Sequence, residues 1–161
     1  ASDVYKRQLG HQIIGQVFGS KIIQAKTDFE LVQVRNLRIK IFVIEQQIPW
    51  RWEFDIHDEN ATHLIVFSSN EIIGTGRFYY DHCYDDYKLG RMAVLSNFRS
   101  QGIGSKILTK IEEIAKSKKV PKIILEAQSD KLNFYFKHGY KVHGDKYLMD
   151  GIYHNKMFKE F

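Results

Sequence analysis

The sequence predicts an α+β fold in which a mixed β-sheet carries helices on its faces. The chain has 161 residues, close to the usual size of one domain, so a single core is expected. Its 43% apolar and 27% charged residues are typical of an ordinary globular protein. The predicted order is strand, helix, three strands in a meander, helix, strand, helix and two strands, which favours an α+β sandwich.

The first predicted elements are a strand over residues 21–26 and a helix that begins at Thr27. Thr27 and Glu30 have the spacing of a capping box, in which each side chain satisfies an otherwise unpaired amide at a helix start. Apolar residues at three- and four-residue steps extend the helix to residues 41–44, for which heavy burial is expected. Pro49 and the tryptophan-rich segment after it predict the end of the helix and a loop.

The central part of the chain predicts a three-stranded meander followed by a long helix. Residues 62–67 and 72–80 have strand character and are joined by a turn at 68–71, and a third strand covers 88–95. From Ile103 the apolar positions recur with a period near 3.6, which indicates an amphipathic helix that ends before Pro121.

The C-terminal part predicts a buried strand, a short helix and a final pair of strands. The strand covers residues 122–127, and the helix covers 130–138 with Gly139 just past its end. Residues 140–161 are expected to form two antiparallel strands around the turn residues Asp150 and Gly151.

The positive charge is concentrated in one segment. The chain has a net charge of +5 and a pI of about 9.2, values that by themselves allow a nucleic-acid or anion binder. Residues 91–122 contain eight cations and two anions, a net charge of +6, which leaves −1 for the rest. The charge of −1 outside this segment argues against nucleic acid as a partner. The absence of a basic and aromatic stripe argues against it as well.

Several classes of protein are disfavoured by composition. The single cysteine, Cys83, excludes an internal disulfide or a cysteine-rich zinc site and favours a reducing, cytoplasmic compartment. Seven histidines occur without an HExxH pattern, so no metal site is expected. The sequence contains no run of 18 apolar residues, so no membrane helix is expected. Residues 1–10 do not resemble a signal peptide; we expect them to be non-native or disordered and the domain to cover 11–161.

The most informative motif is Arg-Ser-Gln-Gly-Ile-Gly-Ser at residues 99–105, between a predicted strand and the amphipathic helix. Glycines at such a turn let backbone amides approach a ligand, and the helix N-terminus favours a phosphate or pyrophosphate. The glycine spacing fits neither a P-loop nor a Rossmann fingerprint. From these residues alone, a plain glycine turn that opens a core helix is an equal alternative.

Residues 89–95 followed by 99–105 resemble the acyl-CoA-binding motif, Q/R-x-x-G-x-G/A, of the GNAT superfamily of N-acetyltransferases. Segments 42–46, 125–140 and 149–157 agree with it in order and spacing, and together they are similar to the ElaA-like branch. The resemblance implies a GNAT-like mixed, mostly antiparallel sheet of about six to seven strands with helices on both faces.

The resemblance also implies acetyl-CoA as the cofactor. The pyrophosphate is then expected on the amides of residues 101–105, and the pantetheine arm on the backbone of 92–94, in a gap between two strands. The residues assigned to the cofactor are Met92, Ala93, Val94, Arg99, Ser100, Gln101, Gly102, Ile103, Gly104, Ser105, Gln128 and Phe134. Gln128 stands where many members of the superfamily carry Asn.

The expected catalytic groups are less well marked. Tyr135 falls where the family often places the tyrosine that protonates the CoA thiolate, although packing is the alternative for any tyrosine. Glu45 is the candidate for a catalytic carboxylate, but no single base stands out. The candidate substrate-binding residues are Trp52, Glu53, Asp55 and Glu126, with Asp58 and Glu59 in the same acidic stretch. An ordinary acidic surface loop, tryptophans packed under it and a strand-filling Glu126 are the alternatives.

These residues predict an acetyl-CoA-dependent N-acetyltransferase that acts on a primary amine of a small molecule by direct attack. Cys83 lies outside the matched motifs, so a covalent acyl-enzyme is not expected. A non-catalytic acyl-CoA-binding or protein-interaction module with the same fold is the alternative, as are an aminoglycoside-like drug or a peptide amine as acceptor. The expected partner is the small-molecule amine, with neither nucleic acid nor membrane; a homodimer is left open.

Overall fold

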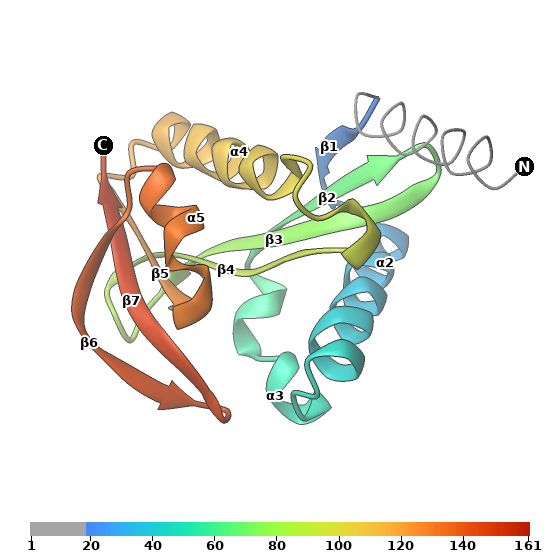
Figure 1. Cartoon of the computed structure of the whole chain (residues 1–161). Coiled ribbons are helices and arrows are strands. Elements are labelled where there is room, and N and C mark those ends of the chain that lie inside the picture. The colour runs from blue at the N-terminus through green and yellow to red at the C-terminus, as the bar shows by residue number, and fades with distance from the viewer. Residues whose placement is uncertain (1–18) are drawn as a thin grey trace, which may run out of the picture.

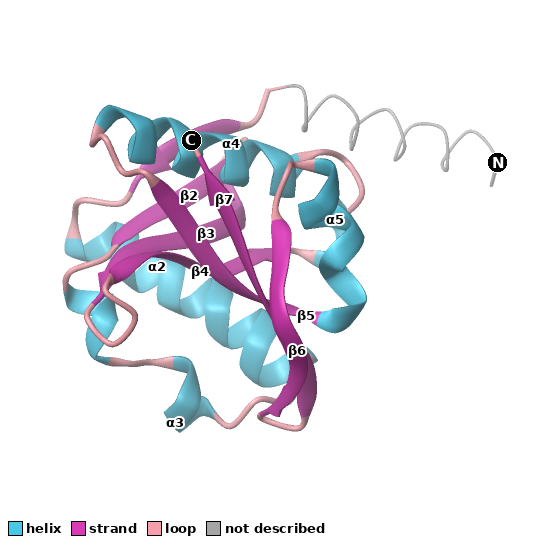
Figure 2. Ribbon diagram, turned by 90° about the vertical axis from the view of Figure 1, so that its left-hand side faces the viewer, coloured by secondary structure: helices cyan, strands magenta, loops and turns pink. Residues whose placement is uncertain are grey.

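The computed structural model describes residues 19–161, which form a seven-stranded sheet with helices on both faces (Figures 1 and 2). The predicted segment 1–10 and the predicted domain start at residue 11 lie outside the described residues. The strands are β1 (Lys21–Gln24), β2 (Thr62–Ser68), β3 (Glu71–Asp81), β4 (Asp86–Val94), β5 (Lys122–Gln128), β6 (Lys141–Met149) and β7 (Ile152–Glu160). The α-helices are α2 (Asp28–Arg38), α3 (Trp50–Glu53), α4 (Ile103–Ser117) and α5 (Leu132–Lys137).

The sheet has the order β1-β2-β3-β4-β5-β7-β6. All neighbouring strands are antiparallel except β4 and β5, which are parallel because α4 carries the chain across between them. Helices α4 and α5 lie on one face of the sheet, and α2 lies on the other (Figures 1 and 2). The predicted mixed, mostly antiparallel sheet with helices on both faces is therefore confirmed.

The start of α2 is built as its local sequence predicts. Thr27 Oγ1 accepts from the Glu30 amide at 3.2 Å, and Glu30 Oε2 accepts from the Thr27 amide at 2.9 Å. The helix continues into a π-helical segment, Ile39–Glu45. Ile41 and Phe42 are buried there, but Ile44 is 69% exposed, so the expectation of heavy burial through residue 44 is wrong.

The segment after Pro49 also differs from the prediction. A loop is predicted from Trp50 onward, whereas the chain forms the one-turn helix α3 and then a 3-10 turn, η2 (Ile56–Glu59). The 3-10 turn is closed by Asp55, whose side chain accepts from the amide of His57. A short helix of this kind has no periodic apolar pattern by which the sequence could reveal it.

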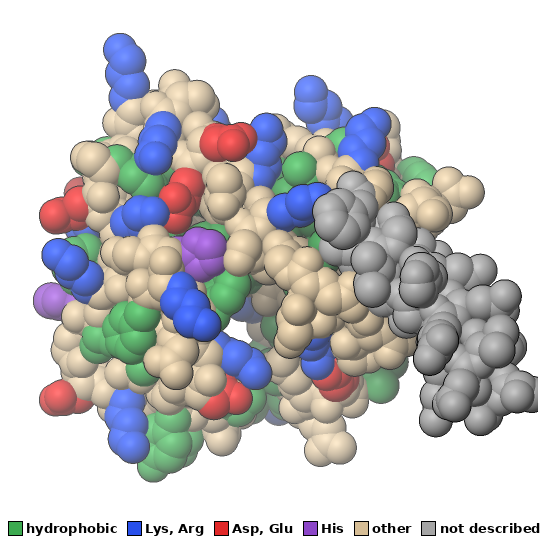
Figure 3. All heavy atoms as spheres, turned by 45° about the horizontal axis from the view of Figure 1, so that its top comes forward, with side chains coloured by type: hydrophobic (Ala, Val, Ile, Leu, Met, Phe, Trp, Pro, Cys, Tyr) green, Lys and Arg blue, Asp and Glu red, His purple; other side chains and the backbone are tan. Residues whose placement is uncertain are grey.

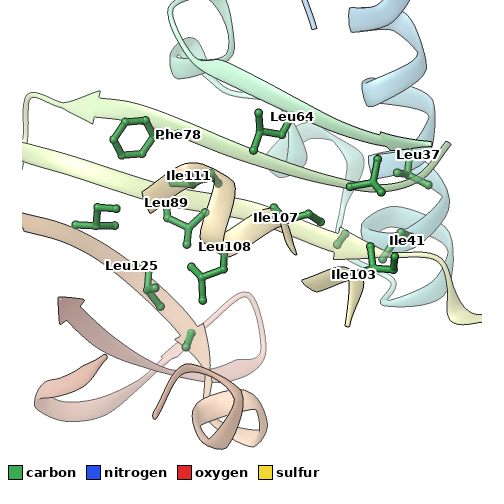
Figure 4. Packing of buried hydrophobic residues seen from close by; sticks show 14 of the residues in the cluster. Leu37, Ile41, Leu64, Phe78, Leu89, Ile103, Ile107, Leu108, Ile111 and Leu125 are labelled. Atoms are coloured by element: carbon green, nitrogen blue, oxygen red, sulfur yellow. The ribbon is translucent and has the colours of Figure 1, made fainter. Parts of the chain in front are cut away.

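The hydrophobic core lies between α4 and the sheet (Figure 4). Ile103, Ile107 and Ile111 are at most 1% exposed and form the apolar stripe of α4. Gly76 in β3 lets the helix approach, because a Cβ added there would lie 2.6 Å from Ile107 Cγ2. The helix that carries the glycine motif is thus fixed closely against the strand next to β4.

Candidate active site

The central feature of the site is a gap between the parallel strands β4 and β5. The two strands pair through three residues only, ending at Leu89 opposite Leu125. Beyond that point β4 continues against β3, and β5 continues against β7. The facing edges of Gly90–Val94 and Glu126–Gln128 are therefore not paired with each other. Unpaired backbone edges of this kind can bind an extended ligand through main-chain hydrogen bonds.

A β-bulge shapes the β4 side of the gap. The pairing of β4 with β3 shifts by one residue at this point, and Arg91 has a φ of +49°. A bulge of this kind bends its strand and redirects side chains, and bulges are frequent beside active sites. The predicted cofactor-binding residues Met92–Val94 follow directly after Arg91 and lie along the gap.

The glycine motif forms the first turn of α4 at the same end of the sheet. Gly102 is the N-cap with a φ of +82°, and no side chain caps the helix. The first intrahelical bond is donated by the Lys106 amide to the Gly102 carbonyl at 3.1 Å. The amides of Ile103, Gly104 and Ser105 therefore have no partner within the helix. Lys and Arg side chains are spread over this side of the molecule, which is hollowed between its two halves (Figure 3).

Helix α5 packs against the N-terminal turn of α4. A Cβ added at Gly104 would lie 3.3 Å from the Phe134 ring, and Ser105 Oγ lies 3.0 Å from His138 Nε2. Tyr135 packs beside Phe134, with ring centroids 5.0 Å apart. Burial raises the pKa of Tyr135 to about 12, so its phenol keeps its proton at neutral pH.

Gln128 spans the mouth of the gap. Its Nε2 donates to Gln46 Oε1 at 2.9 Å, which joins the end of β5 to the segment that follows the π-helix. Gln46 was not among the predicted site residues. It lies within segment 42–46, which resembles the family, so the motif carried a signal for this position although no role was assigned to it.

Glu45 lies beside the glycine motif in an ion pair with Arg99. The two Arg99 Nη atoms donate to the Glu45 carboxylate at 2.5 and 2.8 Å, and Arg99 Nε donates to the Val94 carbonyl at 2.8 Å. The hydrogen bonds from Arg99 lower the pKa of Glu45. The Glu45 side chain is 40% exposed, so the pair ties the end of the long helix to β4 and stays accessible to solvent.

Three acidic residues of the α3 and η2 segment are ion-paired with buried arginines, and together they form what we call the arginine network. Arg38 donates to Glu53 and to Asp58, each at 2.6 Å, and Arg77 donates to Asp55 at 2.6 Å and to Asp58 at 2.8 Å. Burial raises the pKa of Glu53 despite the arginines around it. For Asp58, burial opposes ionisation, but the hydrogen bonds and charges of Arg38 and Arg77 outweigh it and lower the pKa.

Arg91 joins this arginine network to the β4 bulge. Its guanidinium donates to the Trp52 carbonyl at 3.1 Å, to the Glu53 carbonyl at 3.1 Å and to Asp55 Oδ2 at 3.4 Å. Glu53 is only 2% exposed, so it faces arginines and not an open pocket, which corrects its predicted substrate contact. Asp55, with its side chain 30% exposed, is held by Arg77 and Arg91 but reaches the surface.

Two of the alternative interpretations of this stretch do not fit Asp58 or the tryptophans, whereas Glu59 is exposed as a surface loop predicts. The Asp58 side chain is 8% exposed, so it does not belong to an ordinary surface loop. Trp50 and Trp52 are 71% and 45% exposed, so neither indole is packed under the chain.

Glu126 is the first β5 residue beyond the last pair with β4, and its side chain lies on the sheet face opposite α4. Lys88 Nζ lies 2.7 Å from Glu126 Oε2, and the Tyr84 hydroxyl donates to Glu126 Oε1 at 3.3 Å. Burial opposes ionisation of Glu126, but the hydrogen bond and charge of Lys88 outweigh it and lower the pKa. Glu126 also lines a cavity of about 340 Å³ on this face.

The described residues offer neither a metal site nor a membrane-spanning helix. Among residues 19–161, no three His, Cys, Asp or Glu side chains gather into a cluster that could hold a metal ion. In the same part of the chain, no helix is both long and apolar enough to cross a membrane.

Comparison with known proteins agrees with this geometry. Residues 26–161 match the model of the acetyltransferase (GNAT) domain. The chain is 34% identical over 141 residues to the uncharacterized N-acetyltransferase YjcF of Bacillus subtilis, covering 87% of this chain and 99% of the relative. The crystal structure of Escherichia coli ElaA is similar, with a TM-score of 0.77 at 22% identity, covering 88% of this chain and 98% of ElaA.

An acyl-CoA N-acyltransferase from Pseudomonas aeruginosa is similar in the same way. Its TM-score is 0.76 at 24% identity, with 87% of this chain and 97% of that protein covered. At these identities the two solved structures establish the fold, and the family follows from the domain match and the Bacillus relative. The chain therefore belongs to the GNAT family of acetyltransferases.

Proposed function

We propose that the protein is an acetyl-CoA-dependent N-acetyltransferase that acts on a primary amine of a small molecule by direct attack. The observation that carries the proposal is the gap between β4 and β5 with the uncapped N-terminus of α4 beside it. This arrangement offers main-chain donors and acceptors to an extended arm and free amides to a phosphate group.

The residues at the gap have distinct proposed roles toward acetyl-CoA, which supplies an activated acetyl thioester when bound. The amides of residues 101–105 bind its pyrophosphate, and the backbone of Met92–Val94 pairs with its pantetheine arm. Gln128 and Phe134 complete the cofactor site, Gln128 at the mouth of the gap and Phe134 against the first turn of α4.

Tyr135 is the proposed general acid. Because burial raises its pKa to about 12, its hydroxyl is protonated at neutral pH and can give its proton to the departing thiolate sulfur. The amine nitrogen forms the new bond to the acetyl carbon as the carbon–sulfur bond breaks. The hydroxyl makes no hydrogen bond within residues 19–161, so the proton is not committed to another protein group.

Two carboxylates are proposed to handle the acceptor amine. Glu126 holds its ammonium form at the start of the gap, and Glu45 relays the proton that the amine must lose to solvent. Because Arg99 lowers the pKa of Glu45, Glu45 is a weak base, and we expect it to act through water. In Glu45→Gln, kcat should fall while acetyl-CoA affinity is retained. An unchanged kcat would remove Glu45 from the relay.

The cofactor site is tested by calorimetric titration of acetyl-CoA into Gly102→Val. A side chain at this position should abolish binding, because it strains a backbone with positive φ and blocks access to the amides. The matched control is Gly151→Val in the turn between β6 and β7. Both glycines have positive φ, of +82° and +76°, and both have open space around an added Cβ. Normal binding by Gly102→Val would refute the pyrophosphate site.

Thiol release from acetyl-CoA across amine classes tests the reaction itself. Release with a primary amine, and acetylation of that amine by mass spectrometry, are the expected results. A protein that binds acetyl-CoA yet releases thiol with no amine would instead be a non-catalytic acyl-CoA-binding module.

A further inference from the structure

The sheet face opposite α4 carries a hollow between β4 and the β6–β7 pair that the proposed roles above use only in part. Two adjoining cavities of about 340 and 470 Å³ share Tyr84, Glu126, His143 and Lys156 in their linings. We name these four residues and the space between them the open-face cavity. Glu126 is its edge toward the gap, because β5 separates from β4 directly after Leu125.

A bulge in β6 forms the far wall of the open-face cavity. Between the pairs His143–Lys156 and Tyr147–His154, β6 contains two more residues than β7. Gly144, within this bulge, has a φ of +76°. The bulge carries this part of β6 out of regular pairing. The Tyr147 side chain lines the cavity, and its hydroxyl is buried without a hydrogen bond of good geometry within residues 19–161.

The charges in the cavity are unequally compensated. Lys88 lies 2.7 Å from Glu126, and Lys122 lies 2.5 Å from Asp86. Lys156, in contrast, has no carboxylate within 4 Å among the residues that the structure describes. Its ammonium lies 5.0 Å from the centre of the Tyr84 ring and 6.0 Å from that of Tyr147.

His143 lies beside Lys156 in the same cavity. It is the direct cross-strand partner of Lys156, so the two side chains lie on the same face of the sheet. Lys156 is in turn the cross-strand partner of Glu126. The three residues therefore lie in one row across β5, β7 and β6, with a carboxylate at the gap and, beyond it, the Lys156 ammonium, which has no ion-pair partner among residues 19–161.

We infer that the open-face cavity binds an anionic group of the acceptor, so that the substrate is a small amine that also carries a carboxylate or a phosphate. The inference rests on the proposed function, because that function places the reacting amine at Glu126 and so leaves Lys156 for another group of the same substrate. Neighbouring strands lie about 4.8 Å apart, so the backbone positions of Lys156 and His143 are roughly 5 and 10 Å from that of Glu126 across the sheet. An amine and an anionic group separated by a few bonds match this spacing.

Hydrogen bonding in the cavity fits the same class of ligand. Lys156 is the charged donor, and the Tyr147 hydroxyl lies beside the Glu126 carboxylate; burial and that carboxylate raise the pKa of Tyr147, which keeps its proton in place. Conversely, a polycationic acceptor of the aminoglycoside type would bring further positive charge against Lys156. The row of charges therefore disfavours that acceptor class by electrostatic repulsion.

The test compares kcat/KM for two matched pairs of amines, each with and without a negative charge. The pairs are 4-aminobutanoate with 4-aminobutanamide, and 2-aminoethyl phosphate with 2-aminoethanol. We expect the anionic member of at least one pair to be preferred by about 10-fold or more, the range for a charge-assisted hydrogen bond. The pair that shows the preference identifies carboxylate or phosphate as the group that is bound.

Lys156→Met then locates the preference, since it keeps the length of the side chain and removes its charge. We expect KM for the anionic amine to rise about 10-fold, with little change for the neutral one. Lys146→Met is the matched control, because Lys146 lies on the same hairpin over the Tyr153 ring and does not line the cavity. Equal kcat/KM within both pairs, or a preference that Lys156→Met leaves intact, would overturn the inference.

Calorimetric titration of the same amines into the enzyme separates this inference from the proposed function. A binding preference for the anionic amines that Lys156→Met removes supports the anion site even where no thiol is released. Thiol release without any charge preference would retain the transferase and refute the anion site.

Discussion

Two groups of charged side chains lie on either side of the gap between β4 and β5, and they differ in how their charges are compensated. In the arginine network, Arg38 and Arg77 are 1% exposed and are ion-paired with carboxylates from the α3 and η2 segment. In the open-face cavity, Lys156 has no acidic partner within the described part of the chain, and Glu126 is reached from solvent. Both groups consist of ordinary cations and acids.

The difference separates structural from functional charge. A buried ion pair has lost its hydration and is committed to its partner, so the arginine network fixes the α3 and η2 segment to the sheet. A half-exposed and unequally paired group keeps donors and acceptors for a ligand. Four changes test whether the two kinds of charge differ in this way and whether the site beside them is functional.

The largest effect is expected for Arg38→Met, which leaves Glu53 and Asp58 without their main partner. Removing one member of a buried network typically costs about 3–5 kcal/mol in the free energy of unfolding, measured by urea denaturation. Arg35→Met, at an exposed position in the same helix turn, is the control and should change stability by less than about 0.5 kcal/mol. A loss at Arg38 as small as that at Arg35 would show that the network is not structural.

The next effect is expected for Tyr135→Phe, which removes the proposed acid but keeps the ring. Loss of general acid catalysis should lower kcat by about 100-fold, with acetyl-CoA affinity unchanged by calorimetry. Tyr153→Phe, on the exposed hairpin, is the control and should retain kcat. Unchanged turnover in Tyr135→Phe would leave Tyr135 with a packing role only.

A smaller effect is expected for Gly76→Ala, because the added Cβ would lie 2.6 Å from Ile107 Cγ2. Overpacking of this kind costs about 1–3 kcal/mol and should be visible as a lower urea midpoint. Gly90→Ala is the control, since an added Cβ there meets no atom within 4 Å. Equal stability of the two variants would show that α4 can move away from β3 at little cost.

The smallest effect is expected from acid acting on the arginine network. The pKa values of Asp55 and Asp58 are lowered in the folded protein, so their contribution to stability is full above their ordinary pKa near 4 and is lost as pH falls below it. Glu53 acts in the opposite direction, because its pKa is raised and its protonation in acid relieves part of the burial penalty.

The net effect of the three carboxylates should be a fall in the free energy of unfolding between about pH 5 and pH 3. Urea denaturation at each pH measures it. Asp58→Asn should flatten this dependence, whereas Asp130→Asn, at an exposed position, should leave it unchanged. A steeper fall in Asp58→Asn than in the parent would contradict the assignment of Asp58.

Local sequence patterns predicted the elements whose cause is local. The capping box at Thr27 and Glu30, the 3.6-residue period of α4 and the turn at Asp150 and Gly151 each act within a few residues. The glycine motif was equally predictable in position, because an uncapped helix start after a strand follows from the order of the residues.

The partners of the charged residues were not predictable in this way. Glu53 and Arg38 are 15 residues apart, and Glu45 and Arg99 are 54 apart, so nothing in either neighbourhood indicates the pair. The prediction of a substrate contact for Glu53 treated it as a free carboxylate, and its burial against arginines removed that role.

Local patterns in the sequence predicted the strands, the two long helices, the place of the glycine turn and the family resemblance, because periodicity, capping and turn residues act over short distances. The point at which β4 and β5 separate, and the cations and acids that meet around that gap, follow from the three-dimensional packing. Strand pairing and burial depend on segments far apart in the chain, and they determine whether a charge is neutralised inside the fold or left free to bind.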